Sequence, residues 1–173
     1  MLRRTKADDV DDPRDGIAAR GIVVGADDPD ALALLKRLLE STGEEVEAIG
    51  DTGSAVAAVV AGPRRCLVLA FGNQSAAANR KAVDAVRRQL DPVTASTPIV
   101  VVADDEHHVL ATWQAGIDDH LVRPVRGDEL VAAVTAAMTR TERERRDHRR
   151  QGLNRARTAA IAPRGAEAQH VLA

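Results

Sequence analysis

The chain has 173 residues, a formal net charge of −2, and a composition of 45% hydrophobic and 29% charged residues. This length allows one domain with a single core, and the near-neutral charge excludes a general attraction to nucleic acid or to anionic membranes. The one cysteine, Cys66, excludes an intramolecular disulfide framework and a cysteine zinc cluster. No apolar run is long enough to span a membrane and no signal-peptide pattern opens the chain, so we expect a cytoplasmic protein.

The first elements follow a charged leader. Residues 1–19 mix Arg, Lys and Asp with Pro and Gly without periodicity, and we expect them to be mobile. A strand is predicted at 21–26 (GIVVGA). The helix after it has Asp28 as its N-cap and Pro29 as its first residue. Residues 45–50 (EVEAIG) alternate like a half-buried or edge strand, and 51–62 form a short predicted helix.

The same alternation continues along the chain. Buried strands are predicted at 66–71 (CLVLAF) and 99–103 (IVVVA), with a helix at 76–90 and a turn at 91–98 between them. A helix at 104–116, a short strand at 120–122 and a helix from Asp128 complete the pattern. Five strands alternating with five helices predict an α/β fold, a doubly wound parallel sheet of flavodoxin-like (βα)5 order. Its working crevice would lie outside the carboxyl ends of the strands.

Several segments together resemble a bacterial response-regulator receiver domain. They are "IVVGADDPDALALLKRLLESTGEEVEAIGDTGSA", "TPIVVVADD", "AGIDDHLVRP" and "DELVAAV", and the resemblance covers residues 20–139. It implies a domain of two-component signal transduction. A working receiver accepts a phosphoryl group on an aspartate at the end of strand three, beside a Mg²⁺ ion held by two acidic residues after strand one. A Thr or Ser ends its strand four, and a Lys before a proline ends its strand five.

Most of those functional positions hold other residues in this chain. The acceptor position matches Ala70, and no Asp or Glu occurs between Gly62 and Val83. The hydroxyl position matches Ala103, and the Lys position matches Arg123. The resemblance therefore implies a degenerate receiver, also called a pseudo-receiver or atypical response regulator, without the phosphoryl chemistry.

The acidic pair after strand one is also reduced. Its first position matches Ala26 and its second matches Asp27, followed by Asp28. Asp27 and Asp28 form either a remnant metal site or a capped helix start, and we favour the cap because one carboxylate beside an arginine is a poor Mg²⁺ site. We therefore predict no metal or other cofactor.

Arg123 has two readings of its own. It either recognises an anionic ligand or forms an internal ion pair with Asp27, and we favour the pair because Arg makes bidentate carboxylate contacts well. The resemblance also implies a cis bond between Arg123 and Pro124.

A face around strand five is the candidate interface. His120 matches the family's aromatic switch position in that strand, and Trp113 lies on the preceding helix. Trp113 is either a packing residue or, if exposed, part of an interface. With His107 and His108, which open that helix, His120 forms no recognisable metal motif. By resemblance, this face would bind a protein partner or form a homodimer.

The C-terminal extension, 140–173, is basic. Eight arginines and three acidic residues give residues 140–157 a net charge of +5, which leaves −7 for the rest of the chain. A helix continuing past Met138 that is polar on every side is either solvent-exposed or not stably formed. Gly152 and Pro163 are predicted breaks and the Ala-rich end is predicted to be disordered. The arginines that could contact phosphates are Arg143, Arg145, Arg146, Arg149 and Arg150.

The sequence therefore predicts a phosphorylation-independent pseudo-receiver that acts as a protein-interaction module. One alternative is a regulatory domain that binds an anionic ligand at Arg123. A second is a nucleic-acid-binding regulator that acts through the arginine-rich arm. We predict no enzymatic activity, because the strand ends offer no nucleophile paired with a base and no intact metal cluster.

Overall fold

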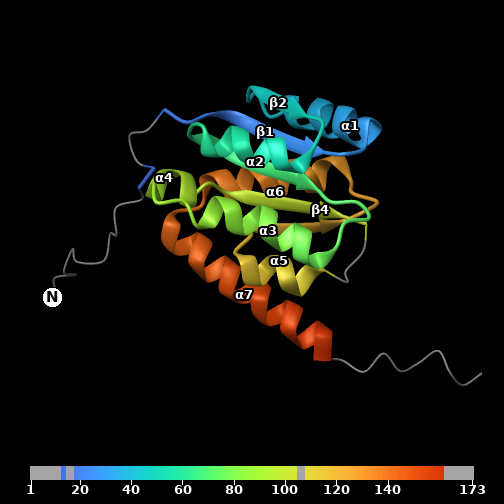
Figure 1. Cartoon of the computed structure of the whole chain (residues 1–173), viewed down its shortest axis with the longest axis vertical. Helices are drawn as coiled ribbons and strands as arrows, with labels where there is room; N and C mark the ends of the chain where they lie inside the picture. The colour runs from blue at the N-terminus through green and yellow to red at the C-terminus, as the bar shows by residue number, and fades with distance from the viewer. Residues whose placement is uncertain (1–12, 15–17, 105–107, 162–173) are drawn as a thin grey trace, which may run out of the picture.

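A computed structural model describes residues 13–14, 18–104 and 108–161. Its sheet has five parallel strands in the order β2-β1-β3-β4-β5, which confirms the predicted flavodoxin-like topology (Figure 1). β2 is an edge strand, as its alternating pattern predicted. The strands are β1 (Arg20–Ala26), β2 (Val46–Ile49), β3 (Arg64–Ala70), β4 (Ile99–Ala103) and β5 (Asp119–Val122).

Helices cover both faces of the sheet. One face carries α1 (Pro29–Glu40) and α6 (Gly127–Thr139). The other face carries α2 (Thr52–Val60), α3 (Ala76–Arg87) and α5 (Val109–Ala115). A short α4 (Pro92–Ala95) precedes β4, and α7 (Glu142–Ile161) packs on the outside of α5 (Figure 1). The described part of the chain thus has seven helices where the sequence predicted five.

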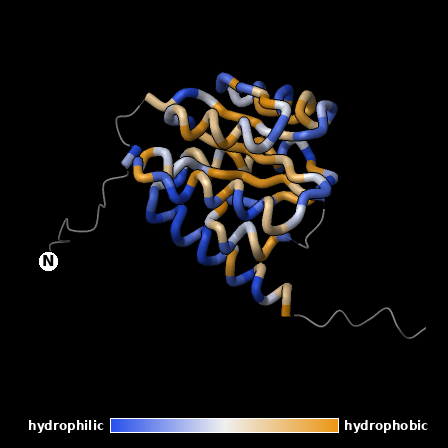
Figure 2. Tube along the Cα trace, in the orientation of Figure 1, coloured by the Kyte–Doolittle hydropathy of each residue, from blue (hydrophilic) through white to orange (hydrophobic). Residues whose placement is uncertain are grey.

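The core is made of aliphatic side chains on the central strands. β1, β3 and β4 are apolar at successive positions because side chains on both sides of the sheet are covered by helices (Figure 2). Val23, Leu67 and Val101 lie in the cluster on one face, and Val24 and Val68 lie in the cluster on the other. Within the described residues, none of the helices is both long and apolar enough to cross a bilayer.

Cys66 belongs to this core. Its thiol is fully buried, and that burial raises its pKa, because the thiolate would have to leave water. Cys66 is therefore a packing residue of the core, with its thiol held in the protonated form.

The predicted start of α1 is confirmed. The Asp28 carboxylate accepts hydrogen bonds from the backbone N–H groups of Asp30, at 2.8 Å, and Ala31, at 3.3 Å. The same Asp-Pro pair recurs at Asp91 and Pro92, where it starts the four-residue α4 inside the segment predicted to be a turn. One helical turn is too short to show a period, so the sequence did not reveal it.

The expectation that the last helix continues past Met138 is wrong. α6 ends at Thr139, and Arg140 is extended, with φ −63° and ψ 137°. A capping box then starts α7: the Glu144 carboxylate accepts from the Thr141 N–H at 2.7 Å, and the Thr141 hydroxyl accepts from the Glu144 N–H at 3.3 Å. The Thr-x-x-Glu signal was present in the sequence and marks the boundary.

The rest of the C-terminal extension also differs from the prediction. α7 runs without a break through Gly152 to Ile161, so Gly152 is no helix terminus. Glu142 and Arg146, four residues apart on α7, form an ion pair at 3.2 Å. Pro163 and the predicted disordered end, 162–173, lie outside the described residues, as does most of the predicted leader.

Candidate functional site

Three alanine methyl groups line the carboxyl edge of the central sheet. Ala26, Ala70 and Ala103 end β1, β3 and β4, and Ala26 pairs in register with Ala70. All three are buried, with at most 5% of their surface exposed. Methyl groups can neither accept a phosphoryl group nor donate a hydrogen bond to one. No nucleophile is therefore present at the strand ends where the resemblance requires one.

The neighbouring carboxylate, Asp27, is held by polar groups of this chain. Its side chain accepts a hydrogen bond from Nε2 of Gln74 and a long one, 3.4 Å, from the backbone N–H of Thr52 at the start of α2. Gln74 lies in the polar loop between β3 and α3. The sequence did not predict that this glutamine reaches Asp27.

Arg123 pairs with Asp104, which corrects the prediction that it pairs with Asp27. Its guanidinium contacts the Asp104 carboxylate and donates to the Phe71 carbonyl at 3.2 Å. The strand order explains the choice. Asp104 follows β4, which is the direct neighbour of β5, whereas Asp27 follows β1, three positions away in the sheet. The bond between Arg123 and Pro124 is cis, as the resemblance implied.

This edge does not fit a magnesium ion. Mg²⁺ needs several oxygen ligands in near-octahedral geometry. The Asp28 carboxylate accepts the hydrogen bonds of the helix cap, and the Asp27 carboxylate accepts one from Gln74. Asp104 forms an ion pair with Arg123. Across residues 13–14, 18–104 and 108–161, no group of three His, Cys, Asp or Glu side chains is placed to hold a metal.

A second polar centre lies at the opposite end of β4. Asp118 is 1% exposed and accepts from the Ile99 N–H at 2.8 Å and from Arg87 at 2.9 Å. Arg87 also donates to three backbone carbonyls, those of Gly116, Ala95 and Thr97, at 2.8, 2.9 and 2.7 Å. Burial lowers the Arg87 pKa to about 10, against the opposing effect of the Asp118 charge. Sequence reasoning did not identify this pair.

α7 joins this centre through its inward face. Arg149 donates to the Asp118 carboxylate, and Gly152 lies against the Trp113 ring, so close that a Cβ on Gly152 would be 2.4 Å from a ring carbon. The ring of His148 stands at 61° to that of Trp113, with 5.9 Å between centroids. Trp113 is only 6% exposed. It is a packing residue covered by α7, which is the first of the two roles predicted for it, and its ring is not exposed for an interface.

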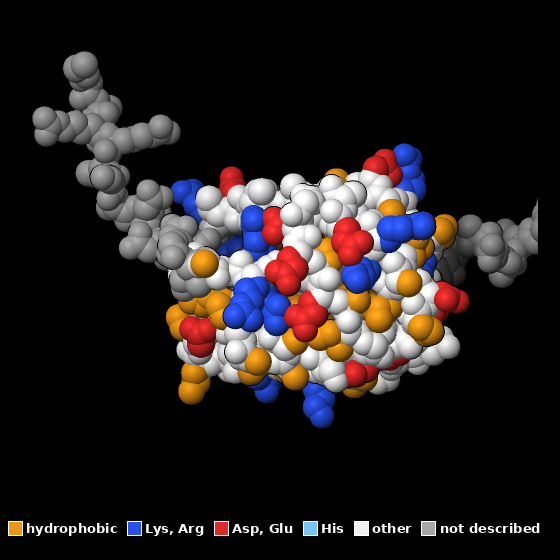
Figure 3. Space-filling view, turned by 90° about the horizontal axis from the view of Figure 1, so that it is seen from above, with side chains coloured by type: hydrophobic (Ala, Val, Ile, Leu, Met, Phe, Trp, Pro, Cys, Tyr) orange, Lys and Arg blue, Asp and Glu red, His pale blue; other side chains and the backbone are white. Residues whose placement is uncertain are grey.

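The arginine arm divides between the two sides of α7. Arg145 is 2% exposed and paired with Glu142 at 2.7 Å, and Arg149 faces Asp118. Arg143, Arg146 and Arg150 are exposed. The expectation that this helix is solvent-exposed on every side is therefore wrong, because its buried side uses charged and small residues instead of an apolar stripe. Figure 3 shows the opposite side of the molecule, that of β2 and α1, where acidic and basic side chains are interspersed.

His120, the other residue of the expected interface, is placed differently from Trp113. His120 lies in β5 and is half-buried. His108 immediately precedes α5 and makes no side-chain cap bond, while His107 lies outside the described residues.

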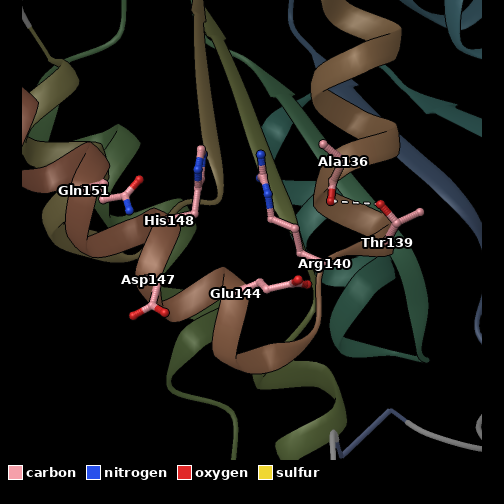
Figure 4. A pocket seen from close by; sticks show the side chains of 7 residues that line it. All are labelled: Ala136, Thr139, Arg140, Glu144, Asp147, His148 and Gln151. Carbon is pink, nitrogen blue, oxygen red and sulfur yellow. Dashed lines mark hydrogen bonds between the residues drawn. The ribbon is translucent and has the colours of Figure 1, made fainter.

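An open hollow of about 510 Å³ lies between the end of α6 and the first turns of α7. Arg140 and His148 point the same way from its wall, and Asp147 points the opposite way (Figure 4). Burial and the nearby Arg140 charge lower the pKa of His148, and Asp119, whose carboxylate is 3.7 Å from Nε2, opposes this. The wall carries both signs of charge, so it favours no one class of ion.

Comparison with solved structures identifies the fold. The receiver domain of a sensor histidine kinase from Pseudomonas aeruginosa, solved with a magnesium ion in its active site cleft, matches with a TM-score of 0.60 and 19% identity, over 71% of this chain and 100% of that one. The chemotaxis response regulator CheY4 of Vibrio cholerae matches with 0.60 and 19%, over 69% and 98%. A putative response regulator from Chloroflexus aurantiacus matches with 0.58 and 23%, over 70% and 99%.

The chain therefore has the fold of a response-regulator receiver domain. No family model matches the sequence, and no curated protein matches it either.

Proposed function

We propose that this protein is a phosphorylation-independent pseudo-receiver, a cytoplasmic bacterial signalling domain that acts by binding another protein. The observation that carries the proposal is the set of side chains at the strand ends. Methyl groups stand at the acceptor and hydroxyl positions, Ala70 and Ala103, and the nearby charged groups are bonded to one another. A receiver fold without these groups retains surfaces for binding but no means of phosphoryl transfer.

The contacts that Arg123 makes within the chain favour protein binding over the alternative that Arg123 binds an anionic ligand. An anionic ligand would have to displace the Asp104 carboxylate and compete with the Phe71 carbonyl for the guanidinium. Nucleic-acid binding by the arginines of α7 is supported less well than the sequence alone suggested, since Arg145 and Arg149 face the domain. A homodimer through the strand-five face stays a prediction.

Intact-mass spectrometry after incubation with acetyl phosphate and Mg²⁺ tests the proposal, with a competent receiver domain treated in parallel. We expect a phosphoryl mass on the competent domain and none on this protein. Beryllofluoride, which mimics the bound phosphoryl group, should leave the melting temperature unchanged. A phosphoryl group on Asp27, Asp28 or Asp104 would overturn the proposal.

A further inference from the structure

The buried side of α7 carries a specific pattern of side chains. Arg145, Arg149, Gly152 and Ala156 are spaced by four, three and four residues, so they lie along one side of the helix. Arg145, Gly152 and Ala156 are buried, and Arg149 is 19% exposed. The pattern is complementary to the domain below it, with a guanidinium opposite a carboxylate and a glycine opposite an indole ring.

The surface under α7 is built by the domain alone. We call it the Trp113–Asp118 face, after two of the residues that contact α7. Asp118 is fixed by Arg87 and by the Ile99 N–H, neither of which belongs to α7. Trp113 packs into the core cluster of the sheet. The carboxylate and the ring would therefore keep their places if α7 moved away.

α7 itself buries few apolar side chains: Ala156 is buried and Leu153 packs against the core cluster. The extended residue Arg140 separates it from α6, so it is not held in place by a continuous helix. Its sequence is largely hydrophilic (Figure 2), and its last five residues, 157–161, are exposed as the helix extends beyond the domain. Segments with few buried apolar contacts open at low free energy, without unfolding the rest of a protein.

We propose that the Trp113–Asp118 face is a binding site for a helix, filled in this chain by α7, and that the partner is a helix of the same pattern. That helix would carry an arginine that meets Asp118 and, three residues later, a glycine that meets Trp113. A helix from a partner would have to displace α7, whose attachment to the same chain gives it a high effective concentration. α7 would thus set the threshold for binding. The inference rests on the proposed function in one respect, that the domain acts by binding a protein.

The test uses the full chain and a labelled peptide of residues 142–161. In the variant Gly152→Leu, the new side chain would occupy the space of the Trp113 ring, so α7 should leave the face open. We expect the peptide, followed by fluorescence anisotropy, to bind the Gly152→Leu chain at least tenfold more tightly than the wild-type chain. Faster amide exchange in α7, with slow exchange kept in β1, β3 and β4, would show that only α7 has been released.

Variants of the peptide test the pattern itself. A peptide with Gly152→Leu or Arg149→Glu should lose binding, because the first substitution removes the fit to Trp113 and the second removes the ion pair with Asp118. A peptide with Thr158→Leu is the matched control, since Thr158 is exposed on α7, and it should bind as the unmodified peptide does. Equal binding by all of these peptides would contradict a site that recognises this pattern.

Arg149→Gln in the full chain covers the case in which Gly152→Leu does not fold. It removes the contact with Asp118 and places no bulk in the core, and it should increase peptide affinity by a smaller factor. The inference is overturned if a folded release variant fails to bind the peptide, or if α7 exchanges as slowly in both variants as in the wild type. The acetyl phosphate experiment tests phosphorylation at the strand ends, which these variants leave unchanged. The proposed function and the helix-binding site can therefore fail separately.

Discussion

Arg149 donates one hydrogen bond to each oxygen of the Asp118 carboxylate, at 2.9 and 3.1 Å, across 31 residues of chain. The contact places a helix in which half of the residues are charged against a domain with an aliphatic core. Arg87 binds the same carboxylate from α3, so one buried anion connects the two helices. Such a centre tolerates the loss of a partner poorly, because the charges that remain are buried and uncompensated.

The first prediction concerns this anion. We expect Asp118→Ala to lower the free energy of unfolding by about 3–5 kcal/mol, because the guanidinium of Arg87 would remain buried without its carboxylate. Asp119→Ala is the matched control, since its side chain is 23% exposed and its pair with His148 is long, and it should cost about 1 kcal/mol or less. Urea denaturation measures both. Equal losses would mean that Asp118 is not the centre of the network.

The second prediction concerns Gly152, where helix propensity and packing have opposite effects on stability. In the middle of an exposed helix, Gly→Ala stabilises by about 1 kcal/mol. At Gly152 the added methyl group would overlap the Trp113 ring, and overpacking costs about 1–3 kcal/mol. We therefore expect Gly152→Ala to destabilise the protein in thermal unfolding, while Gln151→Ala at the exposed neighbouring position does not. A stabilised Gly152→Ala would show that α7 does not pack against this ring as described.

The third prediction is a pH dependence of α7 docking. Burial and the Arg140 charge lower the pKa of His148 in the folded protein, with the Asp119 carboxylate opposing and the Trp113 ring adjacent. The neutral imidazole is therefore favoured when α7 is docked. Its contribution is complete above the ordinary pKa of about 6.5 and is lost as the pH falls through the lowered value.

Amide exchange of α7 between pH 7.5 and 5.5, corrected for the intrinsic pH dependence of exchange, measures this effect. We expect protection to fall on the acid side in the wild type and to vary less in His148→Gln. The Glu142 carboxylate should stay charged in this range: burial alone would raise its pKa, but Arg145 and Arg149 bring it below its ordinary value. An identical profile in the two proteins would exclude His148 as the titrating group.

The fourth prediction restores the missing acceptor. Ala70→Asp should not gain a phosphoryl mass from acetyl phosphate and Mg²⁺, because Ala26 and Ala103 remain methyl groups and Asp27 is bonded to Gln74. It should also destabilise the protein, since position 70 is 3% exposed and a carboxylate there would be desolvated. Ala70→Asn separates the cost of the charge from that of the added volume. A phosphorylated Ala70→Asp would mean that only the acceptor had been lost.

Much of the fold could be predicted because its signals are local. The apolar runs of β1, β3 and β4 and the Asp28-Pro29 helix start are visible in short windows of sequence, and their alternation limits the topology. The alanine that ends β3 was equally visible, since its identification needs only the end of one strand.

The partners of charged side chains were harder to predict, because they depend on which strands are neighbours. Arg123 was assigned to Asp27 although β4, and therefore Asp104, is adjacent to β5. α7 was taken for an exposed or unstable helix because its pattern has no apolar stripe. Its buried side is recognisable only once Asp118 and Trp113 are known to lie opposite Arg149 and Gly152.

The placement of Trp113 has a practical consequence. The chain contains one tryptophan and no tyrosine, so its near-ultraviolet emission comes almost entirely from the indole that α7 covers. Wavelength and quenching of that emission would follow the attachment of the C-terminal helix without an added dye. The protein thus contains a spectroscopic reporter at the contact between α5 and α7.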